Sequence, residues 1–267
     1  MDKDASRGKL PLNYFVLVFV LAVPFWLFGG GKLPLPINLP VGALVTFVPV
    51  TAAAILSYRR SGFTGIKQLL KKAVDYQKIK NKIWYLPILI LMPLIYVLSF
   101  IIMRLARLPL PDPIQIPLFI APVFFLMFFI GAAGEELGWS GYAIDPMQNR
   151  WGALKASLIL GVLWAIWHAI PFVQTENPPM WILWKSLSTI ALRILIVWIY
   201  NNTGKSVFAA ILFHDMVNVS EFLFPNYGSH LDPFVSGLII WLTVAIVIFA
   251  WEPSTLARYR NASVNRF

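Results

Sequence analysis

The chain has 267 residues and no cysteine, and 58% of its residues are hydrophobic while only 13% are charged. A soluble globular domain has about 25% charged residues, so the composition argues against a sizeable soluble domain. The absence of cysteine excludes disulfides and metals held by thiolates. The net charge of +10 does not indicate nucleic acid as a partner, because the basic residues lie in loops between long apolar runs.

Long apolar runs with few charges follow one another along the chain. A helix needs about 20 mostly apolar residues to cross a bilayer, and these runs are too long and too uniformly apolar for the strands of a barrel. The sequence therefore predicts an all-α protein, a polytopic transmembrane helical bundle of about eight spans that forms a single domain over residues 1–267. The predicted spans are 10–31, 33–58, 83–103, 113–134, 156–175, 180–200, 205–224 and 233–251.

The basic residues are distributed unevenly between the two sides of this bundle. Seventeen lysine and arginine residues fall on the side that holds both termini, and three fall on the other side, at Lys32, Arg104 and Arg107. Because loops rich in lysine and arginine stay in the cytoplasm, we expect an integral protein of the bacterial cell membrane with both termini cytoplasmic. Residues 62–82 combine apolar positions about one turn apart with many lysines, which predicts an amphipathic helix on the inner leaflet.

Polar side chains at membrane depth are costly and therefore usually functional. Three places break the apolar pattern, namely Glu135 with Glu136, His168, and His214 with Asn218. The spacing of four places His214 and Asn218 on one face of a helix, whereas adjacent glutamates point about 100° apart, so that only one can face a cavity squarely. A carboxylate, two imidazoles and an amide can activate a water molecule and stabilise an oxyanion.

Each of these motifs also has a simpler interpretation. Glutamates can mark the end of a helix, and a single histidine or asparagine can pack between helices as a hydrogen-bonding residue. The occurrence of all three motifs in one chain favours a site. A metal is a further alternative, because Glu135, His168 and His214 are groups that could hold a divalent ion such as zinc with an open position.

The three segments resemble, in order and spacing, the motifs of the CAAX protease and bacteriocin-processing family, which includes the type II CAAX prenyl endopeptidases. The family motifs are two glutamates followed by an arginine, an aromatic-rich stretch that ends in histidine, and a histidine and an asparagine separated by three residues. The matching segments here are 135–142, 164–168 and 214–218, within a family-like core of residues 60–225. One position departs from the pattern, because Ser140 stands where the family has its arginine.

The resemblance implies an intramembrane endopeptidase of the CAAX-protease type. Its substrate would be a peptide or protein with a hydrophobic or prenylated end near the cytoplasmic face, and membrane lipid would be its other partner. Glu135 and Glu136 would supply the carboxylates, with Glu135 activating the water and His168 assisting it, while His214 and Asn218 would hold the oxyanion or a metal. A catalytically inactive relative that acts as a bacteriocin-immunity or scaffold protein is the alternative.

We expect the site residues to meet in one cavity that is reached from the cytoplasm. With Ser140 in place of the arginine, the glutamate pair would lack a cation and be partly protonated. Arg193 is the only arginine predicted deep in a span. It either pairs with the two glutamates, or bonds carbonyl groups at a helix end or reaches the membrane surface, and the sequence alone slightly favours the second interpretation.

Overall fold

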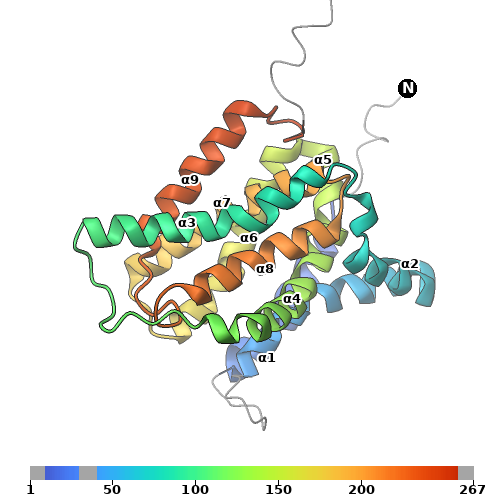
Figure 1. Ribbon diagram of the computed structural model, residues 1–267. Coiled ribbons are helices and arrows are strands. Elements are labelled where there is room, and N and C mark those ends of the chain that lie inside the picture. Colours follow the sequence, from blue (N-terminus) through green and yellow to red (C-terminus); the bar gives the residue numbers. More distant parts are fainter. Residues whose placement is uncertain (1–9, 30–40, 258–267) are drawn as a thin grey trace, which may run out of the picture.

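The computed structural model describes residues 10–29 and 41–257, and the long elements of this part of the chain are all α-helices (Figure 1). The predicted all-α class is therefore confirmed. The helices are α1 (Leu12–Phe28), α2 (Val48–Lys71), α3 (Tyr85–Leu105), α4 (Ala121–Gly138), α5 (Ile144–Trp151), α6 (Ala153–Gln174), α7 (Pro179–Asn202), α8 (Val207–Leu223) and α9 (Pro233–Ala250).

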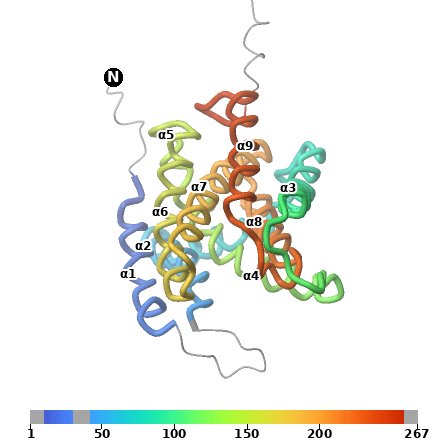
Figure 2. Tube along the Cα trace, turned by 90° about the vertical axis from the view of Figure 1, so that its left-hand side faces the viewer, coloured from blue at the N-terminus to red at the C-terminus, as the bar shows by residue number. Residues whose placement is uncertain are grey.

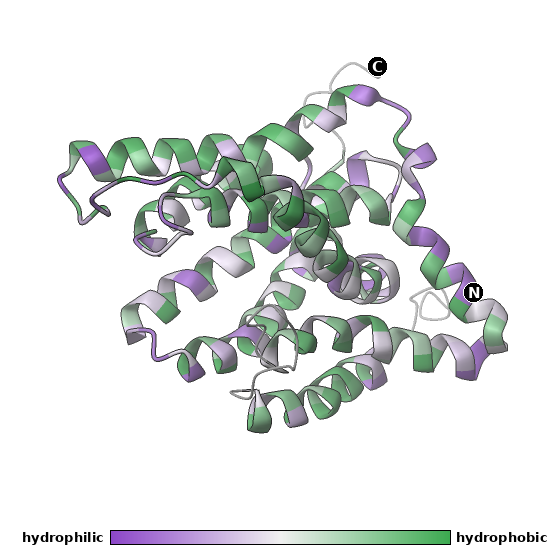
Figure 3. Cartoon of the chain, turned by 60° about the horizontal axis from the view of Figure 1, so that its bottom comes forward, coloured by the Kyte–Doolittle hydropathy of each residue, from purple (hydrophilic) through white to green (hydrophobic). Residues whose placement is uncertain are grey.

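Most of these helices are long enough to cross a bilayer, and Figure 3 shows that they are hydrophobic over most of their length. Six helical stretches in the described residues have the length and composition of membrane spans. The helices α1 and α8 have 17 residues each and bring the bundle to the predicted number of about eight. The chain is an integral membrane protein.

The fourth span differs from its prediction at both ends. Residues 106–117 are not helical, because prolines at four positions of this segment interrupt the backbone hydrogen bonds of a helix. The helix then continues past the predicted end at residue 134, through a π-helical turn at Trp139–Ala143, so that one stretch runs from Leu118 to Trp151. The two glutamates therefore lie in the middle of a long span and not at its end.

The bundle is built around α7, whose residues are buried without interruption from Ala191 to Tyr200. The most extensive helix contacts are those of α6 with α7, of α4 with α8, and of α7 with α9. Figure 2 shows α1, α6, α7 and α9 rising side by side, with α5 and the end of α9 at the same end of the bundle. The three helices that carry the predicted motifs, α4, α6 and α8, therefore all pack in one core.

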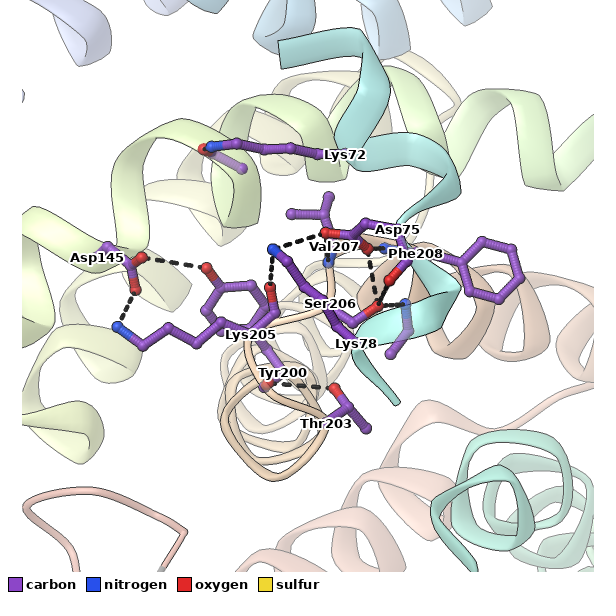
Figure 4. Close-up of polar contacts among 12 residues, drawn as sticks. Lys72, Asp75, Lys78, Asp145, Tyr200, Thr203, Lys205, Ser206, Val207 and Phe208 are labelled. Carbon is purple, nitrogen blue, oxygen red and sulfur yellow. Dashed lines mark hydrogen bonds and ion pairs between the residues drawn. The ribbon is translucent and has the colours of Figure 1, made fainter. Parts of the chain in front are cut away.

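The loops separate into two groups at opposite ends of the bundle. At the end that we call the basic end, Lys78 Nζ donates to the carbonyl oxygen of Lys205 at 3.1 Å and the Lys205 ammonium pairs with Asp145 at 2.9 Å (Figure 4). At the opposite end, the backbone N–H of Asn226 donates to the carbonyl oxygen of Gln115 at 2.7 Å. The described lysines and arginines that lie between spans gather mostly at the basic end, as the topology predicts.

The segment expected to form an amphipathic helix over residues 62–82 is helical only in part. The chain kinks at Gly62, where φ is 59° and ψ is −152°, a conformation that favours glycine. The helix α2 ends at Lys71, and short 3₁₀ turns follow at Lys72–Val74 and Tyr76–Lys78. The prediction of one amphipathic helix over residues 62–82 is therefore wrong beyond Lys71, where the chain turns toward the start of α8.

The carboxylate of Asp75 holds the first turn of α8 in place (Figure 4). Its Oδ1 accepts hydrogen bonds from the Ser206 hydroxyl at 2.8 Å and from the backbone N–H of Phe208 at 3.0 Å. The Ser206 hydroxyl oxygen in turn accepts from the backbone N–H of Ala209 at 3.2 Å. These bonds satisfy N–H groups that a helix start leaves free and place a negative charge at the positive end of the helix dipole. Asp75 thereby fixes the position of α8.

We expect Asp75→Ala to lower the stability of the bundle by about 1–2 kcal/mol, the range found when a capping side chain is lost. Asp75→Asn keeps an acceptor oxygen and should cost less. The measurement is the free energy of unfolding in detergent, with the exposed neighbour Gln77 changed to alanine as the control. Equal stability of Asp75→Ala and Gln77→Ala would show that the contact does not hold α8.

Candidate active site

The predicted site residues come from three helices and approach one another around a single tryptophan. The Trp164 ring centroid lies 5.1 Å from that of His168 and 5.2 Å from that of His214, with both imidazoles nearly perpendicular to it. The indole Nε1–H donates to Glu135 Oε2 at 2.7 Å. Trp164 belongs to the aromatic stretch of the second motif, but its bond to the first glutamate could not be read from the sequence, because the two residues lie on different helices.

Two cavities, and not the single predicted one, are lined by predicted site residues, and Glu136 lines neither of them. The first, of about 300 Å³, is lined by Trp164, His168, His214 and Asn218 among others, and we call it the His214 cavity. The second, of about 340 Å³, is lined by Glu135 and His168 together with mostly apolar side chains, and we call it the Glu135 cavity. His168 belongs to both, so the imidazole stands where the two spaces meet.

Glu135 has a sparse set of partners. It is 7% exposed, and besides the indole of Trp164 the only described group within hydrogen-bond distance is the Thr46 hydroxyl, at 3.3 Å from Oε1. The same hydroxyl lies 3.0 Å from the carbonyl oxygen of Gly131, and its single proton can serve only one of the two acceptors. The sequence contains no signal that distinguishes Thr46 from other threonines in apolar runs. The carboxylate of Glu135 can therefore accept a further hydrogen bond, for example from water.

Glu136, in contrast, is fully buried and has every acceptor position occupied. The Arg193 guanidinium donates to both of its oxygens, at 2.8 and 3.0 Å. The imidazole Nδ1 of His214 lies 3.0 Å from Oε1, and the Ser140 hydroxyl donates to Oε2. Adjacent glutamates therefore have different environments, as expected for side chains about 100° apart on a helix.

The pairing of Arg193 with the glutamate end of the fourth span is confirmed at Glu136, and the interpretation that it bonds helix-end carbonyls or reaches the membrane surface is wrong. Its side chain is 0% exposed, and the guanidinium carbon lies 4.1 Å from the centroid of the Trp164 ring. The cation is thereby held by a bidentate ion pair and by the face of an aromatic ring, which are the arrangements suited to a buried arginine. Arg193 on α7 therefore binds the same carboxylate, that of Glu136, as the Ser140 hydroxyl does.

A second ion pair lies farther along the His214 cavity. The Lys185 ammonium pairs with Glu221, which also accepts a hydrogen bond from the Tyr96 hydroxyl at 3.0 Å. The side chains of Lys185 and Glu221 are 17% and 30% exposed, whereas those of Arg193 and Glu136 are fully buried. Lys185 and Glu221 carried no motif, and only their place on the cavity-facing sides of α7 and α8 reveals them.

The arrangement does not fit the metal that the sequence left open. Within the described residues, no three histidine, aspartate or glutamate side chains form a group that could hold a metal ion. The predicted set of Glu135, His168 and His214 therefore does not form such a group. Glu136 is also engaged on both oxygens by a guanidinium, whose positive charge opposes that of a nearby dication. The chemistry below is therefore derived from the side chains of this chain.

Comparison with known proteins identifies the helices that carry this site. Residues 117–220 match the family described as Type II CAAX prenyl endopeptidase Rce1-like. The protein named CAAX prenyl protease 2 from Methanococcus maripaludis is 34% identical over 109 residues, a stretch that covers 38% of this chain and 40% of that relative. The chain thus spans less than half the length of the relative it matches. The matched residues include all five predicted site residues and Arg193, and they lie within the expected core of 60–225. Residues 117–220 of this chain are therefore similar to the Rce1-like family of type II CAAX prenyl endopeptidases.

Proposed function

We propose that this protein is an intramembrane endopeptidase in which Glu135 activates a water molecule to hydrolyse a peptide bond. The observation that carries the proposal is the contrast between the two adjacent glutamates. Glu136 has both oxygens bound by Arg193 and holds His214, whereas Glu135 faces a cavity and has only two partners among the described residues. A general base needs a free acceptor position within reach of water, and Glu135 offers one.

His168 assists at the point where both cavities meet. Its Nδ1 lies 3.0 Å from the carbonyl oxygen of Trp164. Because a carbonyl oxygen can only accept, Nδ1 carries the proton and Nε2 is an acceptor in the neutral ring, an assignment made from the partner. His168 can therefore orient a water molecule for Glu135.

His214 and Asn218 serve the other reactant, the peptide carbonyl. Both line the His214 cavity, one turn apart on α8, and Asn218 makes no side-chain hydrogen bond to the described residues. The amide of Asn218 is thus free to donate to an oxyanion. Glu136 accepts a hydrogen bond from Nδ1–H of His214 and so fixes the ring, and in the doubly protonated form of the ring Nε2–H is a second donor, which points to the oxyanion.

The reaction then follows from these positions. Glu135 takes a proton from water as the water oxygen bonds to the peptide carbonyl carbon, and the carbonyl oxygen becomes an oxyanion next to Asn218 and His214. The intermediate collapses as the bond from carbon to nitrogen breaks. The leaving nitrogen receives the proton from Glu135, so that the carboxylate of Glu135 is restored and one carboxylic acid and one amine are the products.

The lining of the Glu135 cavity indicates the type of substrate. Apart from Glu135 and His168, its walls are largely apolar and include Phe25, Trp26 and Val45. Such walls favour an apolar group, because burial of apolar surface stabilises binding by about 25 cal/mol per Å². We propose that the substrate is a peptide or protein with a hydrophobic or prenylated end, and that it enters the site within membrane lipid.

The test is cleavage by the purified protein in proteoliposomes. A peptide with a prenylated cysteine and a matched peptide without the prenyl group are incubated with the protein, and the products are identified by mass spectrometry. We expect two fragments from the prenylated peptide and much slower cleavage of the other. If neither peptide, nor a series with other apolar ends, is cleaved by folded protein, the chain is an inactive relative with a scaffold or immunity role.

A further inference from the structure

One charged pair in the His214 cavity has no role in the reaction proposed for Glu135. Lys185 from α7 and Glu221 from α8 both line this cavity, together with His214 and Asn218. Among the described residues of its lining, Lys185 is the only lysine or arginine and Glu221 is the only carboxylate. Because charged groups at membrane depth are costly and usually functional, a role for this pair in the site is to be sought.

The carboxylate of Glu221 has a fixed donor on each oxygen. Its Oε1 accepts a hydrogen bond from the Lys185 ammonium, and its Oε2 accepts one from the Tyr96 hydroxyl at 3.0 Å. Tyr96 is a buried residue of α3, so the carboxylate is held from α3 and from α7 at once. Glu221 thereby fixes the position of the ammonium group at the cavity wall.

The ammonium of Lys185, in contrast, has donors to spare. It carries three N–H groups, and within the described residues Glu221 is the only hydrogen-bond acceptor that it reaches. The centroid of the Trp181 ring lies 5.9 Å from Nζ, a distance at which an aromatic ring still attracts a cation. Two N–H groups are therefore available to an acceptor that enters the cavity.

A carboxylate is the acceptor that suits this ammonium best. A hydrogen bond with charge on both groups is about twice as strong as a neutral one, and apolar surroundings weaken Coulomb attraction less than water does. Much of the cavity lining is apolar, including Phe128, Phe172 and Phe222. The Tyr96 hydroxyl stabilises the charge of Glu221, which leaves part of the attraction of Lys185 for a second anion.

The distance to the reacting carbonyl fits a carboxylate on the same peptide. Glu221 follows Asn218 by three residues on α8, which is about 4.5 Å along the helix axis. An extended peptide advances about 3.3–3.6 Å per residue. A carboxylate bound to Lys185 therefore lies within a few residues of a carbonyl held by His214 and Asn218.

The two cavities then receive different parts of one substrate. The Glu135 cavity has largely apolar walls, the His214 cavity contains the cation, and His168 lines both. We infer that Lys185 binds a carboxylate of the substrate close to the scissile bond, while the apolar end occupies the Glu135 cavity. The inference rests on the proposed function for the identity of the reacting bond, and it makes Lys185 a residue that determines specificity. The carboxylate is that of the C-terminus or of an acidic side chain.

Three peptides with the same prenylated cysteine separate these possibilities. The first ends in a free carboxylate, the second is its C-terminal amide, and the third is the amide with aspartate as the last residue. Each is incubated in proteoliposomes with the unchanged protein, with Lys185→Met and with Lys185→Arg, and kcat/KM is measured. Binding of the same peptides is measured with Glu135→Gln, alone and combined with Lys185→Met, so that affinity is obtained without rapid cleavage.

We expect the unchanged protein to prefer the free carboxylate over the amide by about 10–100-fold in kcat/KM, the effect of a hydrogen bond to a charged group. Lys185→Met should lose this preference, because its kcat/KM for the first peptide falls to that for the amide. Lys185→Arg keeps the charge and should retain part of the preference. Unchanged cleavage of the amide shows that each variant is folded. The third peptide distinguishes the source, because only a side-chain carboxylate would make it a better substrate than the amide.

A preference that persists in Lys185→Met overturns the inference, because a purely structural ion pair would lower cleavage of all three peptides equally. Equal cleavage of the free acid and the amide by the unchanged protein also overturns it. Binding separates this inference from the proposed function. If no peptide is cleaved, yet Glu135→Gln binds the free acid more tightly than the amide and Lys185→Met removes the difference, the carboxylate site stands and the proposed function fails. Equal binding of the two peptides overturns the inference whether or not cleavage occurs.

Discussion

Replacing Glu135 with glutamine is expected to lower kcat/KM by about 10²–10⁴-fold, the contribution of a general base. The amide keeps an oxygen that can accept from Trp164 Nε1–H, so the fold and the stability should be retained. Activity is lost because a glutamine cannot take the proton of the attacking water. The measurement is the initial rate of peptide cleavage together with the free energy of unfolding.

Glu136→Gln is the matched comparison, and its main effect should be on the free energy of unfolding and not on the rate of cleavage. Removing this carboxylate leaves the buried guanidinium of Arg193 without its ion-pair partner, which costs about 3–5 kcal/mol of stability. Activity should weaken without complete loss, because Glu135 remains. Asp215→Asn is the control, since Asp215 is a buried carboxylate beside His214 that lines neither cavity. Equal residual activity in Glu135→Gln and Glu136→Gln would contradict the assignment of the base.

The second large effect is expected for Arg193→Met. The change removes the cation that binds both oxygens of Glu136 and leaves a buried carboxylate without its charge partner, again at a cost of about 3–5 kcal/mol. Because Glu136 orients His214, cleavage should fall together with stability. Arg193→Lys keeps the charge but loses the bidentate geometry, and an intermediate loss is expected.

Rescue distinguishes a specific role of this cation from a general loss of packing. The double variant Arg193→Met with Ser140→Arg places an arginine at the family position, one turn from Glu136 on the same helix, and should recover part of the activity. Lys205→Met is the control, because it also removes a cation from an ion pair, that with Asp145, but at the basic end and away from both cavities. If Arg193→Met retains full activity and stability, or if Ser140→Arg gives no rescue, the ion pair does not support the site.

The sequence is sufficient for the class of fold because membrane spans depend on length and composition alone. The limits of the fourth span could not be predicted. Two of the four prolines before it, Pro113 and Pro117, were counted as part of the apolar run. The polar residues after Glu136 hid a helix that continues through a π-helical turn to Trp151. The segment after Lys71 leaves its helix for a tertiary reason, namely the contact of Asp75 with the start of α8.

The candidate site was predictable as a set of residues but not as a geometry. Spacing places His214 and Asn218 on one face of α8, yet no local pattern indicates that Arg193 reaches Glu136 from a helix 57 residues later in the chain. The division of the site into two cavities at His168 likewise depends on how Trp164 packs between helices.

The most direct test of the central claim is cleavage in water enriched in ¹⁸O, followed by mass spectrometry of the fragment that carries the new carboxylate. If Glu135 activates water, a single turnover introduces one ¹⁸O atom into that carboxylate, and Glu135→Gln forms the labelled product about 10²–10⁴-fold more slowly. A labelled product formed by Glu135→Gln at the rate of the unchanged protein would contradict the account, because the water would then be activated by another group.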